Sequence, residues 1–401
     1  MYRHGIKAKR NLVVLSAMLL GALLASACRP VTAPPAGTAP ELDAATSAKV
    51  DALVEAQMKE LGVPGVAIGI VKDGALVYAK GFGVTKSEGG APVTPGTVFQ
   101  LSSISKTFTA TAILQLVEQG KVDLDAPVTK YLPYFVLADG RQDEITVRHL
   151  LTHRSGLPDS DWTNTAVFKE ARSDEKALED QVRSAREVSL PFDPGTQFAY
   201  SGMGYEALGD IIAKVSGQSY EAYITEHIFV PLGMPHSTLL LADVDPKALA
   251  MPHVPGGDGQ VVASDIFPYT RSFAPDSTLY SNVEDMAAYA IATLRHGAAG
   301  QPAVLTPESY DAAWTIYSQA PFPPPDTAYG FGWQIGEHAG EQVVGHSGID
   351  IGYNSFLAML PAHSTAVIAM TNFNDLEEFV MPAFLMRDGL LDIVLQAFPQ
   401  K

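Results

Sequence analysis

The sequence predicts an α+β fold, in which an antiparallel β-sheet built from the N- and C-terminal segments is flanked by helices and a mainly helical lobe is inserted between them. Three observations support this prediction. Strand-like runs occur near both ends of the chain, residues 104–295 are mostly helical in pattern, and Asp73-Gly74 joins two apolar runs as a hairpin turn. Of the 401 residues, 47% are hydrophobic, which suffices for two substantial layers.

The first 27 residues have the three parts of an export signal: a basic start, an apolar run over 12–24, and small residues over 25–27. Leu-Ala-Ser-Ala-Cys at 24–28 resembles a bacterial lipobox, which implies lipidation of Cys28 and a lipid anchor in a membrane of the cell envelope. Ordinary cleavage after Ala27 is the alternative. Residues 28–41 are rich in Pro, Ala and Thr and are expected to form a tether.

The elements of the sheet are expected in two groups. A helix over 42–61 precedes the hairpin, because its apolar residues fall on one face and Gly62 follows. Near the other end, runs rich in β-branched and aromatic residues predict strands over 329–335, 342–346, 353–360 and 366–371, and an amphipathic helix over about 376–398.

The composition excludes some functions. The chain carries 27 basic and 44 acidic residues and a net charge of −17, so nucleic acid would be repelled and is not expected as a partner. Cys28 is the only cysteine, so no intramolecular disulfide is possible.

One stretch, Thr97–Gly120, predicts chemistry. An apolar run leads into a serine cluster and then a helix without charge between Lys106 and Glu118, which indicates a buried helix. Ser103 and Lys106 lie three positions apart, so the amine can reach the hydroxyl as a possible base for a nucleophile. A second Ser-x-x-Lys match at 173–176 lies in a highly polar segment, where its lysine would stay hydrated.

Six segments in order resemble the serine β-lactamase-related family, which includes class C β-lactamases, D-Ala-D-Ala carboxypeptidases and several esterases. They are 97–133 (with SSISK), 145–159 (RHLLTHRSGLPD), 198–234 (YSGMGYEALG), 279–290 (LYSNVEDM), 329–333 (YGFGW) and 345–361 (GHSGIDIGY). The resemblance implies a serine hydrolase domain over 42–401 with the β-lactamase/penicillin-binding-protein type of fold. It implies an acyl-enzyme mechanism that needs no cofactor and no metal.

The resemblance also implies roles for individual residues. Ser103 becomes the nucleophile, Lys106 its partner and Tyr200 the tyrosine of the second motif. The backbone N–H groups of Ser103 and Ile349 would form the oxyanion hole. The residues expected at the substrate are Gly202, His346, Ser347 and Gly348.

The second motif has a rival, because Tyr280-Ser281-Asn282 matches Tyr-x-Asn literally whereas Tyr200 is followed by Ser201-Gly202. Ser281 and Glu284 can be explained as a capping box that opens a helix, so Tyr200 is preferred.

The base is left open between Lys106 and Tyr200. Burial and the positive end of the helix are expected to disfavour the lysine ammonium, whereas a nearby ammonium favours tyrosinate, so the two are treated as a coupled pair.

Two departures from the family pattern bear on the substrate. Gly202 removes an amide that contacts the antibiotic in β-lactamases, and His346 replaces a lysine that faces the substrate carboxylate. An ester, or a D-amino-acid amide or peptide, is therefore favoured over a β-lactam. The alternatives are a β-lactamase and a non-catalytic binder of penicillin or cell-wall peptide.

Two further motifs could indicate an α/β-hydrolase elbow and a metal site, but the rest of the sequence does not support either interpretation. Residues 345–349 nearly match Gly-x-Ser-x-Gly, but the alternating β/α pattern of α/β-hydrolases is missing. His149 and His153 have a spacing that metal ligands can have, but no Glu of the His-Glu-x-x-His type and no cysteine lies nearby, so they are interpreted as buried structural histidines.

Overall fold

The computed structural model describes residues 41–161, 164–257, 259–298, 303–321 and 327–399, and these belong to one compact unit, Ala39–Lys401. The predicted export signal, Cys28 and nearly all of the tether lie outside the described residues. No helix in the described ranges is long and apolar enough to cross a membrane.

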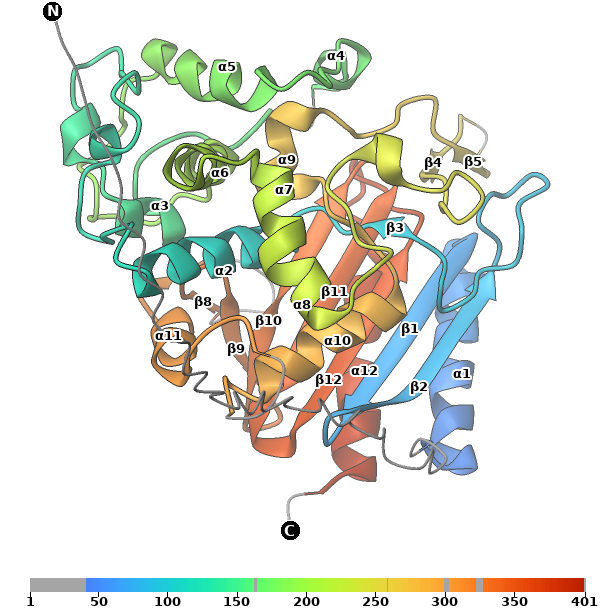
Figure 1. The fold of residues 1–401 in the computed structure, drawn as a ribbon. Helices are drawn as coiled ribbons and strands as arrows, with labels where there is room; N and C mark the ends of the chain where they lie inside the picture. Colours follow the sequence, from blue (N-terminus) through green and yellow to red (C-terminus); the bar gives the residue numbers. More distant parts are fainter. Residues whose placement is uncertain (1–40, 162–163, 258, 299–302, 322–326, 400–401) are drawn as a thin grey trace, which may run out of the picture. The chain divides into compact units, whose positions relative to one another are not determined.

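An antiparallel sheet forms the centre of this unit, and within the described residues it has eight strands in the order β2-β1-β12-β11-β10-β9-β8-β7 (Figure 1). The N-terminal hairpin therefore pairs directly with the last strand of the chain, and the predicted α+β fold is confirmed. The strands are β1 Gly65–Lys72, β2 Ala75–Gly83, β7 Ser318–Gln319, β8 Ala328–Tyr329, β9 Gln334–His338, β10 Glu341–Asp350, β11 Tyr353–Leu360 and β12 Thr365–Thr371.

Both faces of the sheet are buried, and the alternation of side chains along β12 shows it. Val367 and Ala369 belong to the hydrophobic cluster under α1 (Ala44–Leu61) and α12 (Pro382–Ala397). Ile368 and Met370 point to the opposite face, where α10 (Val283–Leu294) packs. Figure 1 shows α10 in front of the sheet with α1 and α12 behind it. Because successive side chains of a strand point to opposite faces, the apolar residues of β12 contribute to both faces of the sheet.

The last helix begins at Pro382, so the predicted start near residue 376 is wrong. Asp375 and Val380 form a β-bridge, which keeps the intervening residues out of a helix. Proline lacks an N–H and is tolerated in the first turn, so Pro382 fits the start of α12.

The buried helix predicted after Ser103 is α2, Ser105–Glu118, in which every residue from Ser105 to Leu116 is buried. It packs against α6, α7, α9 and α11, so its lack of charge is explained by the helices around it. The other α-helices in the described part of the chain are α3 Val147–Leu151, α4 Thr165–Lys169, α5 Ala177–Arg183, α6 Gly202–Ser216, α7 Tyr220–Ile224, α8 Val230–Leu232, α9 Ala274–Ser277 and α11 Pro307–Ala313.

Two pairs of short strands complete the lobe, and one of them leads to the candidate site. β3 (Phe99–Gln100) pairs antiparallel with β6 (Tyr280–Ser281), and β4 (His253–Pro255) pairs with β5 (Val261–Ala263). β3 ends just before the serine cluster, so it anchors the entry into α2.

Candidate active site

Ser103 lies in the turn between β3 and α2. Ser102 adopts a left-handed backbone conformation with φ of 50°, which is sparsely populated for a residue with a side chain and marks strain of about 1–3 kcal/mol. Ser102 is also bridged to Thr278. The turn is thereby held in place, and Ser103 stands half-buried at the mouth of the helix.

Lys106 reaches Ser103 from the first turn of α2. Its Nζ donates a hydrogen bond to Ser103 Oγ at 3.3 Å and another to the backbone oxygen of Asp276 at 3.1 Å. The residue is only 1% exposed. The predicted pairing of hydroxyl and amine is therefore present, in a place from which water is largely excluded.

Tyr200 approaches the same two groups from the segment before α6. Lys106 Nζ lies 4.7 Å from the centre of the Tyr200 ring, and the phenol is hydrogen-bonded to Ser103 and Lys106. The imidazole of His153 packs against the ring at 4.2 Å between centroids. His153 Nδ1 accepts a hydrogen bond from Ser201 N, so the histidine fixes both the ring and the backbone that follows it.

Tyr280, the rival tyrosine, is elsewhere. It is fully buried in β6 among Val98, Leu249 and Tyr269, and its hydroxyl has no hydrogen-bond partner among the described residues. The helix that follows is capped by Asn282, whose side chain accepts from Asp285 N, so the predicted cap at Ser281 is wrong by one residue.

A cavity of about 190 Å³ gathers most of the predicted site residues. Gly202 and Gly348 are not among its lining residues. The lining residues are Ser103, Lys106, Asp159, Tyr200, Asp276, Ser277, Gln334, His346, Ser347, Ile349, Asp350, Phe379 and Phe384.

Gly348 acts through its lack of a side chain. A Cβ at this position would lie 2.1 Å from the backbone oxygen of Leu101, a distance that real structures do not allow. Glycine therefore lets β10 approach the residues just before Ser103, and this approach places Ile349 at the cavity.

Gly202 is also crowded, in this case by side chains of the candidate site. A Cβ here would lie 1.9 Å from Ser160 Oγ and 2.6 Å from Asp276 Oδ2. In the Tyr-x-Asn motif an asparagine would stand at position 202. The space that its side chain would need is occupied here by Ser160 and Asp276. Asp276 Oδ2 also lies 3.6 Å from Lys106 Nζ, so a carboxylate from α9 faces the lysine.

A buried acidic cluster continues behind Asp276. Ser160 Oγ lies 2.8 Å from Glu206 Oε1 and 3.1 Å from Asp276 Oδ2, and Gln181 donates to Glu206 Oε2. Burial and the charge of Asp276 raise the pKa of Glu206 to about 8. Burial also raises the pKa of Asp276, against the attraction of Lys106. Glu206 therefore holds its proton to higher pH than an ordinary carboxyl group, and the member of the cluster that faces Lys106 is Asp276.

The pKa of Lys106 is raised, contrary to the expectation that the ammonium would be disfavoured. Burial lowers this pKa, but the negative charges at Tyr200, Asp276 and Asp159 outweigh it. Burial raises the pKa of Tyr200, although the positive charge of Lys106 acts against it. The prediction failed because it counted burial and the helix end, but not the effect of Tyr200 on the lysine or the carboxylates of Asp276 and Asp159.

His346 is neutral in this site. Burial first, and then the charge of Lys106, lower its pKa to about 3. Its Nε2 lies 2.9 Å from Tyr329 Oη, and its Nδ1 lies 2.6 Å from the backbone oxygen of Ser347. The imidazole is thus held by two hydrogen bonds and supplies no cationic charge to a substrate carboxylate.

The other sequence motifs have structural explanations. His149 Nδ1 accepts from Thr146 N as part of a capping box, and the second Ser-x-x-Lys pair, Ser173 and Lys176, is exposed. Ser347 lies within strand β10, where no strand-to-helix turn presents it. Among the described residues no group of three His, Cys, Asp or Glu side chains could hold a metal ion.

A model of the family described as Beta-lactamase matches residues 50–390. The chain belongs to the beta-lactamase family. This membership confirms the resemblance inferred from the six sequence segments.

Curated relatives share about three residues in ten with the chain. Protein flp of Staphylococcus aureus (strain MW2) is 29% identical over 331 residues, which cover 81% of this chain and 63% of the relative. Esterase EstB of Burkholderia gladioli is 32% identical over 229 residues, 55% of this chain and 58% of the relative. The chain thus spans less than two thirds of the length of these relatives.

Solved structures support the same fold. The octameric penicillin-binding protein homologue from Pyrococcus abyssi has a TM-score of 0.77 and 33% identity, covering 88% of this chain and 78% of that one. The D-amino acid amidase from Ochrobactrum anthropi SV3 has a TM-score of 0.76 at 22% identity, covering 88% and 99%, which shows a shared fold alone.

Sequence reasoning missed three side chains that support this beta-lactamase-family site, namely Ser160, Glu206 and Asp276 in the acidic cluster. It interpreted His153 as a buried structural histidine, which it is, but not as the residue that packs behind Tyr200. Glu206 carried a signal, because it is an acid inside the apolar helix segment Gly202–Ser216. Such an acid is either exposed on one face or buried with a partner, and this one is fully buried.

Proposed function

We propose that this protein is a serine hydrolase that cleaves an ester or a D-amino-acid amide or peptide through an acyl-enzyme on Ser103. The observation that carries the proposal is the 3.3 Å contact between Lys106 Nζ and Ser103 Oγ in a cavity that Tyr200 also lines. A nucleophile, a proton acceptor and an orienting group are the parts that such chemistry requires.

The proposed reaction begins with attack of Ser103 Oγ on the substrate carbonyl, as the serine proton passes to the Lys106–Tyr200 pair. The negative oxygen of the tetrahedral intermediate would accept hydrogen bonds from the backbone N–H groups of Ser103 and Ile349. Loss of one such donor lowers rates about a hundredfold or more. The proton then goes to the leaving alcohol or amine, and water releases the acyl group from Ser103.

Within the pair, we assign the proton transfer to Tyr200. Lys106 faces the Asp276 carboxylate at 3.6 Å, so it remains an ammonium through the cycle. The positive charge beside Tyr200 favours its tyrosinate form, which accepts the proton of Ser103 Oγ as that oxygen attacks and then, as the phenol, gives the proton to the leaving group. Lys106 therefore holds and polarises the other two groups, while Tyr200 moves the proton.

The substrate class follows from charge and from the relatives. His346 is neutral, and the place of a motif amide is filled by Ser160 and Asp276, so recognition of an anionic β-lactam is weakened. Likeness to a protein named esterase EstB favours esters, and the fold shared with a D-amino acid amidase is compatible with amides.

The test is turnover of a chromogenic ester, a chromogenic cephalosporin and a D-Ala-D-Ala peptide, each beside the Ser103→Ala variant. Turnover of the ester or peptide that the variant loses supports the proposal. Preferred turnover of the cephalosporin would make the protein a β-lactamase. A stable adduct without turnover would make it a non-catalytic binder.

We also propose that the protein is exported and anchored to a cell-envelope membrane through a lipid on Cys28. The support is the sequence alone: a signal-like start, the lipobox-like residues 24–28 and the tether that follows. Mass spectrometry of the membrane-extracted protein tests this, because a mature N-terminus at Cys28 carrying acyl chains is expected. An N-terminus without acyl chains would contradict it.

A further inference from the structure

Three buried side chains form a hydrogen-bonded series behind Lys106. Asp276 Oδ2 lies 3.6 Å from Lys106 Nζ and 3.1 Å from Ser160 Oγ. Ser160 Oγ in turn lies 2.8 Å from Glu206 Oε1. The three residues come from α9, from the segment before α4 and from α6, and all are buried. The lysine beside the nucleophile is thereby connected to a carboxyl group that the proposed mechanism does not use.

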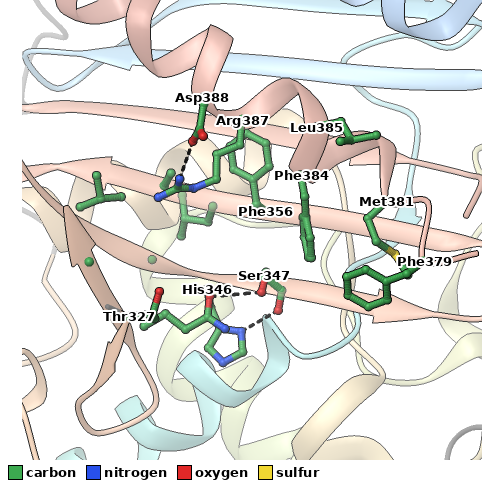
Figure 2. Close-up of a pocket in the computed structure, with 16 residues that line it drawn as sticks. Thr327, His346, Ser347, Phe356, Phe379, Met381, Phe384, Leu385, Arg387 and Asp388 are labelled. Atoms are coloured by element: carbon green, nitrogen blue, oxygen red, sulfur yellow. Dashed lines mark hydrogen bonds and ion pairs between the residues drawn. The ribbon is translucent and has the colours of Figure 1, made fainter. Parts of the chain in front are cut away.

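Ser160 and Glu206 lie outside the space in which a substrate would react. Neither residue lines the catalytic cavity, whereas Asp276 does. Neither lines the larger cavity of about 290 Å³ either, which Figure 2 shows between the strand that carries His346 and the helix that carries Phe384. An effect of Ser160 or Glu206 on catalysis therefore has to pass through a neighbour, and Ser160 contacts Asp276.

The Ser160 hydroxyl lies between two carboxyl groups but has only one proton to donate. If both groups were charged, two negative charges would compete for this proton in a buried site, which is strongly unfavourable. If one group is protonated, it donates to Ser160 Oγ while Ser160 donates to the other group. Each oxygen is then satisfied, so the geometry indicates that one carboxyl group carries a proton.

The surroundings indicate that this proton lies on Glu206. Asp276 faces the Lys106 ammonium and accepts a hydrogen bond from Ser277 Oγ at 3.0 Å, and both contacts favour its charged form. Glu206 instead contacts neutral groups, because Gln181 Nε2 donates to its Oε2 at 3.0 Å and Ser160 lies at its Oε1. Burial, and then the charge of Asp276, raise the pKa of Glu206, which agrees with this assignment.

The charged groups that act on Glu206 come from two elements packed against α6. These are Lys106 of α2 and Asp276 of α9, while α5 contributes the neutral Gln181. Asp159 acts in turn on Lys106 and Asp276. Other charged side chains around α6 form ion pairs of their own, namely Arg148 with Asp125, Arg172 with Asp180, Arg183 with Glu179, and Arg271 with Glu221.

Gly202 leaves the room that this series needs. A Cβ at position 202 would lie 1.9 Å from Ser160 Oγ and 2.6 Å from Asp276 Oδ2, which are the two atoms of the middle hydrogen bond. The glycine that departs from the Tyr-x-Asn motif is therefore required for the contact between Ser160 and Asp276.

We propose that Glu206 and Ser160 are positioning residues of the catalytic site: protonated Glu206 turns the Ser160 hydroxyl toward Asp276, and this hydrogen bond holds the Asp276 carboxylate against Lys106. The inference rests on the proposed hydrolase function and extends it beyond the residues that line the cavity. When Glu206 loses its proton, its carboxylate competes for the Ser160 hydroxyl and adds a negative charge near the Lys106–Tyr200 pair. That charge opposes formation of the tyrosinate, so catalysis should weaken.

Infrared spectroscopy tests the proton without requiring turnover. The C=O stretch of a protonated carboxyl group is separate from the bands of a carboxylate, so the wild type should show a component that disappears as the pH rises. Glu206→Gln should lack this component, whereas the exposed Glu55→Gln should keep it. Asp350, whose pKa burial also raises, contributes a component that both variants retain. A spectrum that Glu206→Gln leaves unchanged would overturn the inference.

Ester hydrolysis tests the link through Ser160. Glutamine at position 206 keeps an N–H donor toward Ser160 Oγ, whereas methionine, of similar length, does not. We expect kcat/KM of Glu206→Gln to exceed that of Glu206→Met about fivefold, the effect of one hydrogen bond. In a Ser160→Ala background the two variants should be equal, because no hydroxyl remains to be oriented. Thermal unfolding of each variant confirms that it is folded.

The pH profile gives a readout that a purely structural role would not change. Wild-type kcat/KM should fall as the pH rises through the pKa of Glu206, and Glu206→Gln should lack this fall. Equal activity of Glu206→Gln and Glu206→Met, or a difference that persists in the Ser160→Ala background, would overturn the positioning role while Ser103-dependent hydrolysis still stood. A Glu206 infrared component without turnover of any ester would support the buried proton and refute the hydrolase function.

Discussion

Asp276 Oδ2 lies 3.6 Å from Lys106 Nζ, and these side chains are 6% and 1% exposed. A carboxylate at this distance in a dry site favours the ammonium, because their attraction is weakly screened. The pair therefore determines the charge of the group beside the nucleophile.

Replacing Asp276 with asparagine should lower the Lys106 pKa, since the nearest negative charge from a carboxylate is lost. If the ammonium supports catalysis, the alkaline limit of the kcat/KM profile should move to lower pH. The pH profile of ester hydrolysis measures this, with the exposed Asp245→Asn as control. A limit that stays in place or moves upward would show that Lys106 does not act as a cation.

Removing the Tyr200 hydroxyl should abolish most activity, whereas removing that of Tyr280 should not. Loss of a general acid–base group lowers rates by roughly 10²–10⁴-fold, so Tyr200→Phe should lose about that much in kcat/KM. Tyr280→Phe deletes a buried hydroxyl without a partner among the described residues, so its stability should be equal or higher. The reverse pattern would move the second motif to Tyr280.

The success of the fold prediction came from local patterns. Asp73 and Gly74 both have positive φ, 50° and 79°, which is the backbone that a two-residue hairpin turn needs. Apolar runs near both ends likewise predicted strands. The pairing of β1 with β12 is a contact between distant segments, and it was expected because strand-like runs lie near both ends of the chain with helices between them.

The site was predictable only where its residues are close in sequence. Ser103 and Lys106 are three apart, so helix geometry brings them together. Asp276 is 170 positions from Lys106 and reaches it through a fold-level contact. Because neither that carboxylate nor the effect of Tyr200 on the lysine was counted, the direction of the Lys106 pKa shift was predicted wrongly.

Gly202 should tolerate no side chain while Ser160 is present. A Cβ would lie 1.9 Å from Ser160 Oγ, so Gly202→Ala should lower the free energy of unfolding by about 1–3 kcal/mol, as other overpacked sites do. In a Ser160→Gly background the penalty should shrink, because the obstructing atoms are gone. Denaturant unfolding of the four proteins in this double-mutant cycle measures the coupling, and additive effects would refute the steric explanation.

Glu206 should make stability fall with rising pH. Its pKa is about 8 in the folded protein against an ordinary value of 4.5, so the folded state holds this proton more tightly. That stabilisation is complete below about pH 4.5 and is lost as the pH rises through 8. The free energy of unfolding of Glu206→Gln, relative to wild type, should therefore increase from pH 5 to pH 8.5. The exposed Glu55→Gln serves as control, and a constant difference for Glu206→Gln would contradict the buried proton.

The acyl-enzyme is the central claim, and its covalent bond can be observed directly. The wild-type protein is mixed with a slowly hydrolysed ester, quenched in acid, and analysed by intact mass and peptide mapping. The account predicts one added acyl group on the peptide that contains Ser103, and none in Ser103→Ala. An acyl group on another residue, or hydrolysis that persists undiminished in Ser103→Ala, would contradict it.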